Sequence, residues 1–266
     1  MDTIRYLQRL NYLGPTEPNA KTLRQLQLAH LQAVPFENLS IHSGEPIVLN
    51  DQALFEKIVV RRRGGFCYEL NGLFASLLRE LGFKVTMLSA GVANAAGEFG
   101  PEFDHMTLLV TAPNAPDEHW LADVGFGDSF NEPLLLDVRT AQHRGARTYR
   151  LDAVEDRLML LQQENDGDWV AQYRFSLEPH EYPDYSEMCV YHQTSPESHF
   201  TKAPVCTRIT SEGRITLSGL RFISTRLGVR DEQKVADAVE FHKILSEQFG
   251  IELERQLILS RGKSQR

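Results

Sequence analysis

Cys67 follows Gly64, Gly65 and Phe66 at the start of a predicted helix, in the stretch RRRGGFCYELNGLF that covers residues 61–74. A cysteine in the first turn of a helix lies near unpaired backbone N–H groups and the positive end of the helix dipole, and both favour the thiolate. Gly64 and Gly65 allow a tight turn into the helix and leave space above the sulfur. Burial as a small apolar side chain is the competing interpretation, because cysteine is among the most buried residue types.

A thiolate nucleophile needs an imidazole partner and a group that orients the imidazole. His105 lies in the β-rich segment FDHMTLLV, and Asp123 lies among apolar residues in WLADVGFG. A carboxylate with apolar neighbours is costly to bury unless something pairs with it. Two antiparallel strands joined by a turn over residues 113–118 would bring the imidazole and the carboxylate together. The sequence therefore predicts a catalytic set of Cys67, His105 and Asp123. A strand histidine bound to a backbone carbonyl, and a carboxylate in a turn or bulge, are the structural alternatives.

The spacing of the cysteines, histidines, aspartates and glycines does not indicate a metal site or a nucleotide site. Cysteine, histidine and aspartate are all metal ligands, but no pair has a close spacing such as C-x-x-C or H-x-x-x-H. The glycines of GVANAAGEFG do not form a G-x-x-x-x-G-K-[ST] motif, and no strand-GxGxxG-helix unit occurs. We therefore predict no metal site and no nucleotide-binding fold.

The composition predicts a cytoplasmic globular protein. The chain has 266 residues, 42% of them apolar, which is enough for a large core. Its 28 basic and 36 acidic residues give a net charge of −8, which disfavours binding to nucleic acid and to anionic lipid. Three irregularly spaced cysteines indicate a reducing compartment rather than a disulfide framework. We see no secretory signal and no apolar run near the roughly 20 residues that span a bilayer.

The order of predicted elements indicates an α+β fold. Apolar periodicity predicts helices over residues 2–10, 22–34, 51–59, with Asp51 as cap, and 66–81, with Gly82 as the stop. Strands are predicted over 84–92, 103–111 and 119–126, followed by hairpins over 157–177, with a turn at 165–168, and around 211–214, and by a helix over 237–249. This order of helices, then strands, then a mixed C-terminal region differs from the alternating order of βαβ units.

Three separated motifs closely resemble the arylamine N-acetyltransferase family: PFENL (35–39), RGGFCYELNGLF (63–74) and DVGFG (123–127), with His105 in an F-x-H-M-x-L context. The resemblance covers nearly the whole chain. It implies a cysteine-protease-like core with an N-terminal helical bundle, a central antiparallel β-barrel-like region and a C-terminal α/β lid. The corresponding domains are 1–83, 84–190 and 191–266. It also implies that Cys67 is the nucleophile, His105 its base and Asp123 the third member.

The resemblance further implies the substrates and their pocket. Phe36 and Phe126 resemble residues that line the family's arylamine pocket, and Phe200 resembles the aromatic near the thiol end of coenzyme A. Ordinary core packing is the alternative for each of the three. The resemblance implies acetyl transfer from acetyl-CoA, as a co-substrate and not a tightly bound cofactor, to arylamines, arylhydrazines or arylhydroxylamines. It makes Glu37 a structural partner of Arg63 or the backbone, and it leaves a homodimer open.

Two other functions stay open on the sequence. A transglutaminase-like thiol hydrolase or acyltransferase has the same order of Cys, His and Asp, but it acts on peptides and needs an open cleft. A non-catalytic protein of the same fold would use the pocket to bind an aromatic ligand. Turnover of a peptide without acetyl-CoA would favour the first, and an unreactive Cys67 thiol would favour the second.

Overall fold

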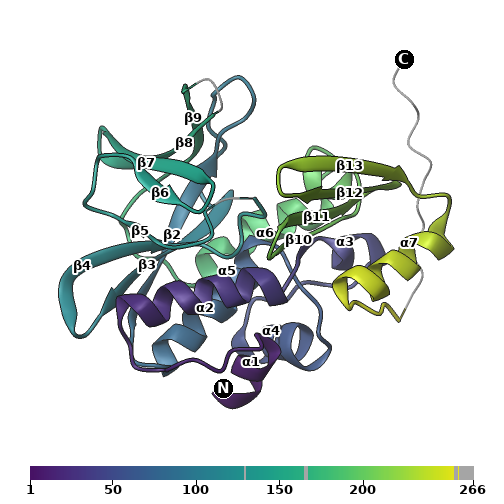
Figure 1. Ribbon diagram of the computed structural model, residues 1–266, viewed down its shortest axis with the longest axis horizontal. Coiled ribbons are helices and arrows are strands. Elements are labelled where there is room, and N and C mark those ends of the chain that lie inside the picture. Colours follow the sequence, from purple (N-terminus) through teal and green to yellow (C-terminus); the bar gives the residue numbers. More distant parts are fainter. Residues whose placement is uncertain (129, 165–166, 255–256, 258–266) are drawn as a thin grey trace.

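The fold of this chain, seen in a computed structural model, is α+β, as the order of predicted elements indicated. Two antiparallel sheets lie at opposite ends of the long axis, and the helices gather beneath and between them (Figure 1). The structure describes residues 1–128, 130–164, 167–254 and 257. The predicted turn residues Asn165 and Asp166 and the C-terminal stretch SRGKSQR lie outside the described residues.

The helices fall mainly in the first third of the chain. In chain order they are α1 (Thr3–Arg9), α2 (Ala20–Ala33), α3 (Leu39–Ser43), α4 (Asp51–Phe55), α5 (Cys67–Glu80), α6 (Ser186–Thr194) and α7 (Ala238–Ile244). Turns of π-helix continue α4 and α7, and two 3-10 turns flank α6: η1 (Glu56–Val60), η2 (Tyr182–Tyr185), η3 (His199–Thr201) and η4 (Leu245–Phe249). The predicted stop at Gly82 is confirmed, because this glycine follows the helix end with a φ of +93°.

The larger sheet has eight strands in the order β5-β4-β3-β2-β9-β8-β7-β6. Its strands are β2 (Lys84–Val92), β3 (His105–Ala112), β4 (Ala115–Ala122), β5 (Leu134–Leu135), β6 (Gln142–Arg144), β7 (Arg147–Val154), β8 (Arg157–Gln163) and β9 (Trp169–Phe175). Its two edge strands come together, because the Gln142 side chain bonds both the N–H and the carbonyl of Leu135, at 2.9 Å each. This contact nearly closes the sheet, in agreement with the predicted barrel-like region.

The smaller sheet pairs one short strand from the first part of the sequence with four strands from the last third. Its strands, in spatial order, are β1 (Phe36–Glu37), β10 (Val205–Thr210), β11 (Gly213–Ser218), β12 (Arg221–Arg226) and β13 (Val229–Lys234). The Asn38 side chain extends the junction, since it donates to the carbonyls of Phe200 and Ala203 and accepts from the N–H of Val205. The division into domains 1–83, 84–190 and 191–266 stays our proposal.

Helix α5 is the centre of the largest core cluster. Twelve of its fourteen residues are buried, including Phe74 and Leu77, and it packs against β2 and β3. A buried amphipathic helix normally keeps one polar face, so this degree of burial requires neighbours on every side. Those neighbours are β2 and β3 on one face and α1, α4 and the 182–189 segment on the others. The first turn of α5 is thereby held rigidly below the larger sheet.

Two sequence predictions about local structure are wrong. The expected turn over 113–118 is only the pair Pro113–Asn114, and β4 already begins at Ala115. Its polar residues resembled a loop because the first half of the strand is exposed while the second half is buried. The cap of α4 is Asn50 and not Asp51, because the Asn50 side chain accepts the Ala53 N–H at 2.8 Å.

None of the helices in the described ranges combines the length and apolarity that a bilayer span requires.

His30 lies on the buried face of α2, where the helix packs on α1 and α5. Its Nε2 lies 3.0 Å from the Tyr6 hydroxyl, and its ring packs against Phe74. Burial lowers the pKa of His30 to about 3, and the nearby Arg9 guanidinium adds to this effect. The folded protein therefore keeps this imidazole neutral, whereas the unfolded chain protonates it below about pH 6.5.

We expect His30 to make the protein less stable in mild acid. As the pH falls from about 6.5 to about 5, proton uptake by the unfolded state removes about 2 kcal/mol of the free energy of unfolding. His30→Gln cannot titrate, so its denaturant-measured free energy should depend less on pH by that amount. The exposed His119→Gln is the matched control. An unchanged slope in His30→Gln would contradict a neutral His30.

Candidate active site

The first turn of α5 places Cys67 at the floor of a cavity. Phe66 precedes the helix in extended conformation, and its backbone N–H donates to the Glu69 carboxylate at 3.1 Å. The contact gives a hydrogen-bond partner to one of the backbone N–H groups that have no partner within the helix at its start. The carboxylate itself is buried and bonds Lys57 Nζ at 2.6 Å. Glu69, two residues after Cys67 on the same helix, therefore fixes the position of the helix start and of the cysteine.

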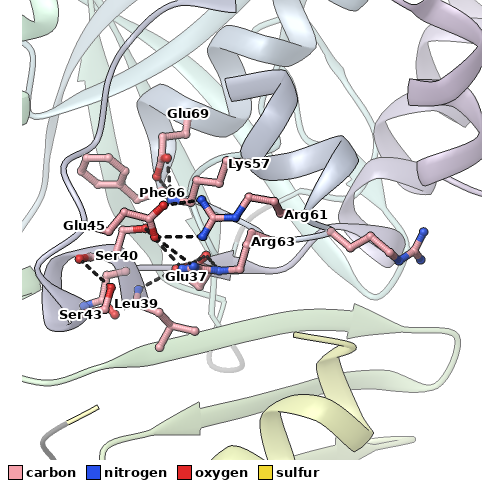
Figure 2. Close-up of polar contacts among 12 residues, drawn as sticks. Glu37, Leu39, Ser40, Ser43, Glu45, Lys57, Arg61, Arg63, Phe66 and Glu69 are labelled. Carbon is pink, nitrogen blue, oxygen red and sulfur yellow. Dashed lines mark hydrogen bonds and ion pairs between the residues drawn. The ribbon is translucent and has the colours of Figure 1, made fainter. Parts of the chain in front are cut away.

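A buried network of charges fixes the RRRGG segment just before that helix (Figure 2). The Arg63 guanidinium bonds Glu37 at 2.8 Å and Glu45 at 3.4 Å, and Glu37 also accepts the Leu39 N–H at 2.6 Å. The predicted pairing of Glu37 with Arg63 is thus confirmed. Burial alone would raise the pKa of Glu37, but Arg63 and Lys57 outweigh it and hold that pKa below its ordinary value. The Glu37 carboxylate therefore stays ionised and anchors β1 to this segment.

His105 and Asp123 form the hydrogen bond that the strand pattern predicted. The His105 Nε2 lies 2.7 Å from Asp123 Oδ2, and both side chains are buried. His105 begins β3, and Asp123 follows the last residue of β4, so the two lie diagonally across adjacent strands. Burial raises the pKa of Asp123, but His105, Asn71 and the Gly125 N–H outweigh burial and lower it. The carboxylate is therefore ionised at neutral pH.

Two further side chains complete the environment of Asp123, and the sequence analysis missed both. Asn71 Nδ2 donates to Asp123 Oδ1 at 2.9 Å, and the Tyr173 hydroxyl donates to Oδ2 at 3.1 Å. Asn71 lies four residues after Cys67, on the same face of α5, so helical spacing could have identified it. Tyr173 comes from β9, fifty positions away along the chain, and no local pattern points to it.

Gly125 allows the loop after Asp123 to touch the start of α5. A Cβ at this position would lie 2.7 Å from Cys67 Cα and 2.9 Å from the Cys67 carbonyl oxygen. These are backbone atoms that cannot move aside, so only glycine permits the close approach. The Val124 N–H also donates to Asn71 Oδ1 at 2.8 Å. The loop and the helix therefore share one fixed geometry, and the nucleophile candidate and the carboxylate come together through it.

All the sequence-predicted pocket residues line one cavity of about 340 Å³ with Cys67 and His105. Phe36 comes from β1, Phe126 from the loop after β4, and Phe200 from η3. The Phe126 ring packs edge-on against the His105 imidazole, and the Phe36 and Phe200 rings lie 6.1 Å apart. The cavity is thus largely apolar and aromatic around a sulfur and an imidazole, which suits a flat apolar ligand.

The thiol of Cys67 is not ionised by its surroundings alone. Burial raises the pKa of Cys67 well above its ordinary value, and the carboxylates of Asp104 and Asp123 raise it further. This opposes the helix dipole, which favours the thiolate. Asp123 occupies Nε2 of His105, so Nδ1 is the ring nitrogen left to take the proton; no hydrogen bond joins Cys67 Sγ to the ring among the described contacts. A thiolate at Cys67 therefore requires a base that accepts the thiol proton, and His105 Nδ1 is the candidate.

Cys189 and Cys206 are also free and buried, and burial raises the pKa of each thiol. Neither residue lines the cavity. Across residues 1–128, 130–164 and 167–254, no group of three His, Cys, Asp or Glu side chains is arranged to hold a metal ion. The cavity is therefore the place where thiol chemistry, apolar walls and an oriented imidazole coincide.

Comparison with known proteins gives the family. The N-acetyltransferase family model matches residues 19–258. The chain belongs to the arylamine N-acetyltransferase family. A Salmonella typhimurium protein named arylamine N-acetyltransferase / N-hydroxyarylamine O-acetyltransferase is 35% identical over 249 residues, covering 92% of this chain and 87% of the relative.

Solved structures of family members have the same fold. The arylamine N-acetyltransferase of M. tuberculosis superposes with a TM-score of 0.88 at 35% identity, covering 94% of each chain. The Mycobacterium marinum arylamine N-acetyltransferase, solved in complex with CoA, gives a TM-score of 0.87 at 35% identity, covering 94% of this chain and 93% of that one. The family and the fold class predicted from the motifs are confirmed.

Thiol alkylation should reveal whether His105 takes the proton of Cys67. With iodoacetamide at about pH 7, we expect Cys67 to react at least about tenfold faster in the unmodified protein than in His105→Ala. In the variant, the rate should rise only as the pH approaches the raised pKa of the thiol. Peptide mapping by mass spectrometry distinguishes the three cysteines, and Cys189 and Cys206 serve as internal controls. Equal rates at Cys67 in both proteins would contradict a role for His105.

Proposed function

We propose that this chain transfers an acetyl group from acetyl-CoA to arylamines, arylhydrazines or arylhydroxylamines through an acetyl-cysteine at Cys67. The observation that carries the proposal is one aromatic cavity that contains the Cys67 thiol beside an imidazole oriented by a buried carboxylate. Membership in the arylamine N-acetyltransferase family supports it. Acetyl-CoA is then a co-substrate that leaves after each half-reaction, and no tightly bound cofactor is needed.

In the first half-reaction, the Cys67 sulfur attacks the thioester carbonyl of acetyl-CoA while its proton moves to His105 Nδ1. The bond between the carbonyl carbon and the coenzyme sulfur then breaks. The departing coenzyme thiolate takes the proton from His105, and an acetyl thioester remains on Cys67. Asp123 keeps the imidazole in the required tautomer and stabilises the imidazolium as it forms.

In the second half-reaction, the neutral amine nitrogen attacks the acetyl carbon on Cys67 and gives its proton to His105. The bond from carbon to the Cys67 sulfur breaks, and the sulfur recovers the proton from the imidazole. Splitting the transfer into two steps avoids a direct attack of a weakly nucleophilic amine on bound acetyl-CoA. We assign the tetrahedral oxyanion of each step to backbone N–H groups near the start of α5.

The acceptor pocket is formed by the aromatic side chains Phe36, Phe126 and Phe200. Their rings come from three separate parts of the chain and leave an apolar space next to the sulfur. Flat aromatic amines bury much apolar area in such a space, and their nitrogen is uncharged and nucleophilic at neutral pH. Aliphatic amines are protonated at that pH and cannot attack.

The rival functions are disfavoured by the same observations. A thiol hydrolase acting on peptides needs a long open cleft, whereas the thiol here lies in a small aromatic cavity. A non-catalytic aromatic-binding protein has no need for an imidazole whose second nitrogen is held by a buried acid. A cytoplasmic location and a homodimer stay proposals that the composition and the family resemblance suggest.

We expect acetyl-CoA alone to leave one acetyl group on Cys67, because the first half-reaction needs no amine. Intact-mass spectrometry followed by peptide mapping measures it. Cys67→Ser should lose the acetyl mark and at least about 10³-fold of the turnover with an arylamine. Cys189→Ser is the matched control and should keep both. Acetylation at Cys189 or Cys206, or turnover without an acetyl-enzyme, would overturn the mechanism.

A further inference from the structure

A second acid and imidazole pair lies on the wall of the same cavity. Asp104, directly before His105, lines the cavity and lies close enough to Cys67 to raise the pKa of its thiol. Its Oδ1 lies 3.3 Å from Nε2 of His192, a buried residue of α6. Neither residue is part of the acetyl-transfer steps derived above, so the pair needs a separate explanation.

A serine contact holds the ring of this pair in place. His192 Nδ1 lies 3.0 Å from Ser198 Oγ, and that oxygen accepts the Phe200 N–H at 3.3 Å. Since the hydroxyl oxygen already accepts one N–H, its own proton is free to be donated to Nδ1. With Nδ1 in contact with Ser198, Nε2 is the ring nitrogen that lies beside the Asp104 carboxylate.

The carboxylate of Asp104 is ionised although it is mostly buried. Burial would raise the pKa of Asp104, but the N–H groups of His192 and Val92 beside the carboxylate outweigh burial and lower it. The Val92 N–H donates to Oδ2 at 3.2 Å. About one-sixth of the side chain remains exposed, and the residue lines the cavity. A negative charge therefore lies in the wall of the space that we assign to the acceptor.

No lining cation offsets this charge. Among the lining residues that the structure describes, Asp104 is the one Asp, Glu, Lys or Arg. Burial lowers the pKa of the lining His199, so at neutral pH its ring is uncharged. His105 is already paired with Asp123. Asp104 thus sets the sign of the electrostatic potential within an otherwise apolar and aromatic pocket.

We propose that Asp104 is a specificity residue for the acceptor: it rejects arylamines that carry a carboxylate and favours those that carry a cation or a hydrogen-bond donor. This inference rests on the proposed acetyl transfer and names the acceptor class of that site. A carboxylate on the ring would meet a fixed like charge in a medium of low dielectric, where repulsion is only partly screened. A donor or cationic substituent would instead meet an acceptor that is already ionised.

The test compares three acceptors that differ mainly in charge: para-aminobenzoate, para-aminobenzamide and para-amino-N,N,N-trimethylanilinium. In a two-step mechanism, kcat/KM for the acceptor reports only the second half-reaction, and ratios to the neutral amide remove any change in Cys67 reactivity. All three acceptors are assayed at the same pH of about 8, above the ordinary pKa of a free imidazole. We expect Asp104→Asn to raise the benzoate-to-benzamide ratio and to lower the anilinium-to-benzamide ratio, each on the order of tenfold.

Glu102→Gln is the matched control, because it removes an equal charge two residues earlier from an exposed pair with Arg157, outside the cavity. It should leave both ratios unchanged. Ratios that do not move in Asp104→Asn, or that move equally in Glu102→Gln, overturn the inference. If thermal unfolding shows that Asp104→Asn is not folded, Asp104→Ser is the second neutral variant, judged by the same ratios.

The experiment separates this inference from the proposed function. Acetylation of Cys67 by acetyl-CoA alone, measured by intact mass in each folded variant, tests the first half-reaction without any acceptor. If the unmodified protein forms no acetyl-enzyme, the proposed function fails. If the acetyl-enzyme forms and the acceptor ratios do not respond to the Asp104 charge, only the specificity assignment fails.

Discussion

The buried carboxylate of Asp123 is the constraint on which the site depends. A fully buried acid stays ionised only when donors replace the water that it has lost, and Asp123 receives four from His105, Asn71, Tyr173 and the Gly125 N–H. These donors come from β3, α5, β9 and the loop after β4. Satisfying one carboxylate therefore fixes how the central helix meets the larger sheet, and with it the place of Cys67.

In the mechanism that we propose, the reactivity of the Cys67 sulfur depends on the His105 imidazole. Burial keeps the thiol protonated, which protects it from unselective oxidation and alkylation. The imidazole, held by Asp123 on one nitrogen, offers the other as the place to which that proton can go. The same low dielectric that disfavours a lone thiolate strengthens the attraction within a thiolate–imidazolium pair once it forms.

The parts of the site that depend on local sequence could be predicted, and the parts that depend on register could not. A cysteine shortly after Gly-Gly at a helix start and an acid among apolar residues are local signals, and they predicted Cys67 and Asp123 as site residues. The exposed first half of β4 resembled a loop because charged residues there do not alternate with apolar ones. Tyr173 and the Asp104–His192 pair depend on which strands and helices are neighbours, and a single sequence contains no local signal for that.

The pairing of β1 with β10 has a consequence for how the protein is made. Phe36 is opposite Thr207 in that pairing, and the carbonyls of Phe200 and Ala203 are bound by Asn38. One side of the cavity is thus built from segments about 170 positions apart. In a chain growing on the ribosome, the Cys67 thiol, the His105 imidazole and the Asp123 acid are all present long before that side exists. Translation must pass residue 205 before the cavity has its second wall, so synthesis itself delays the onset of activity.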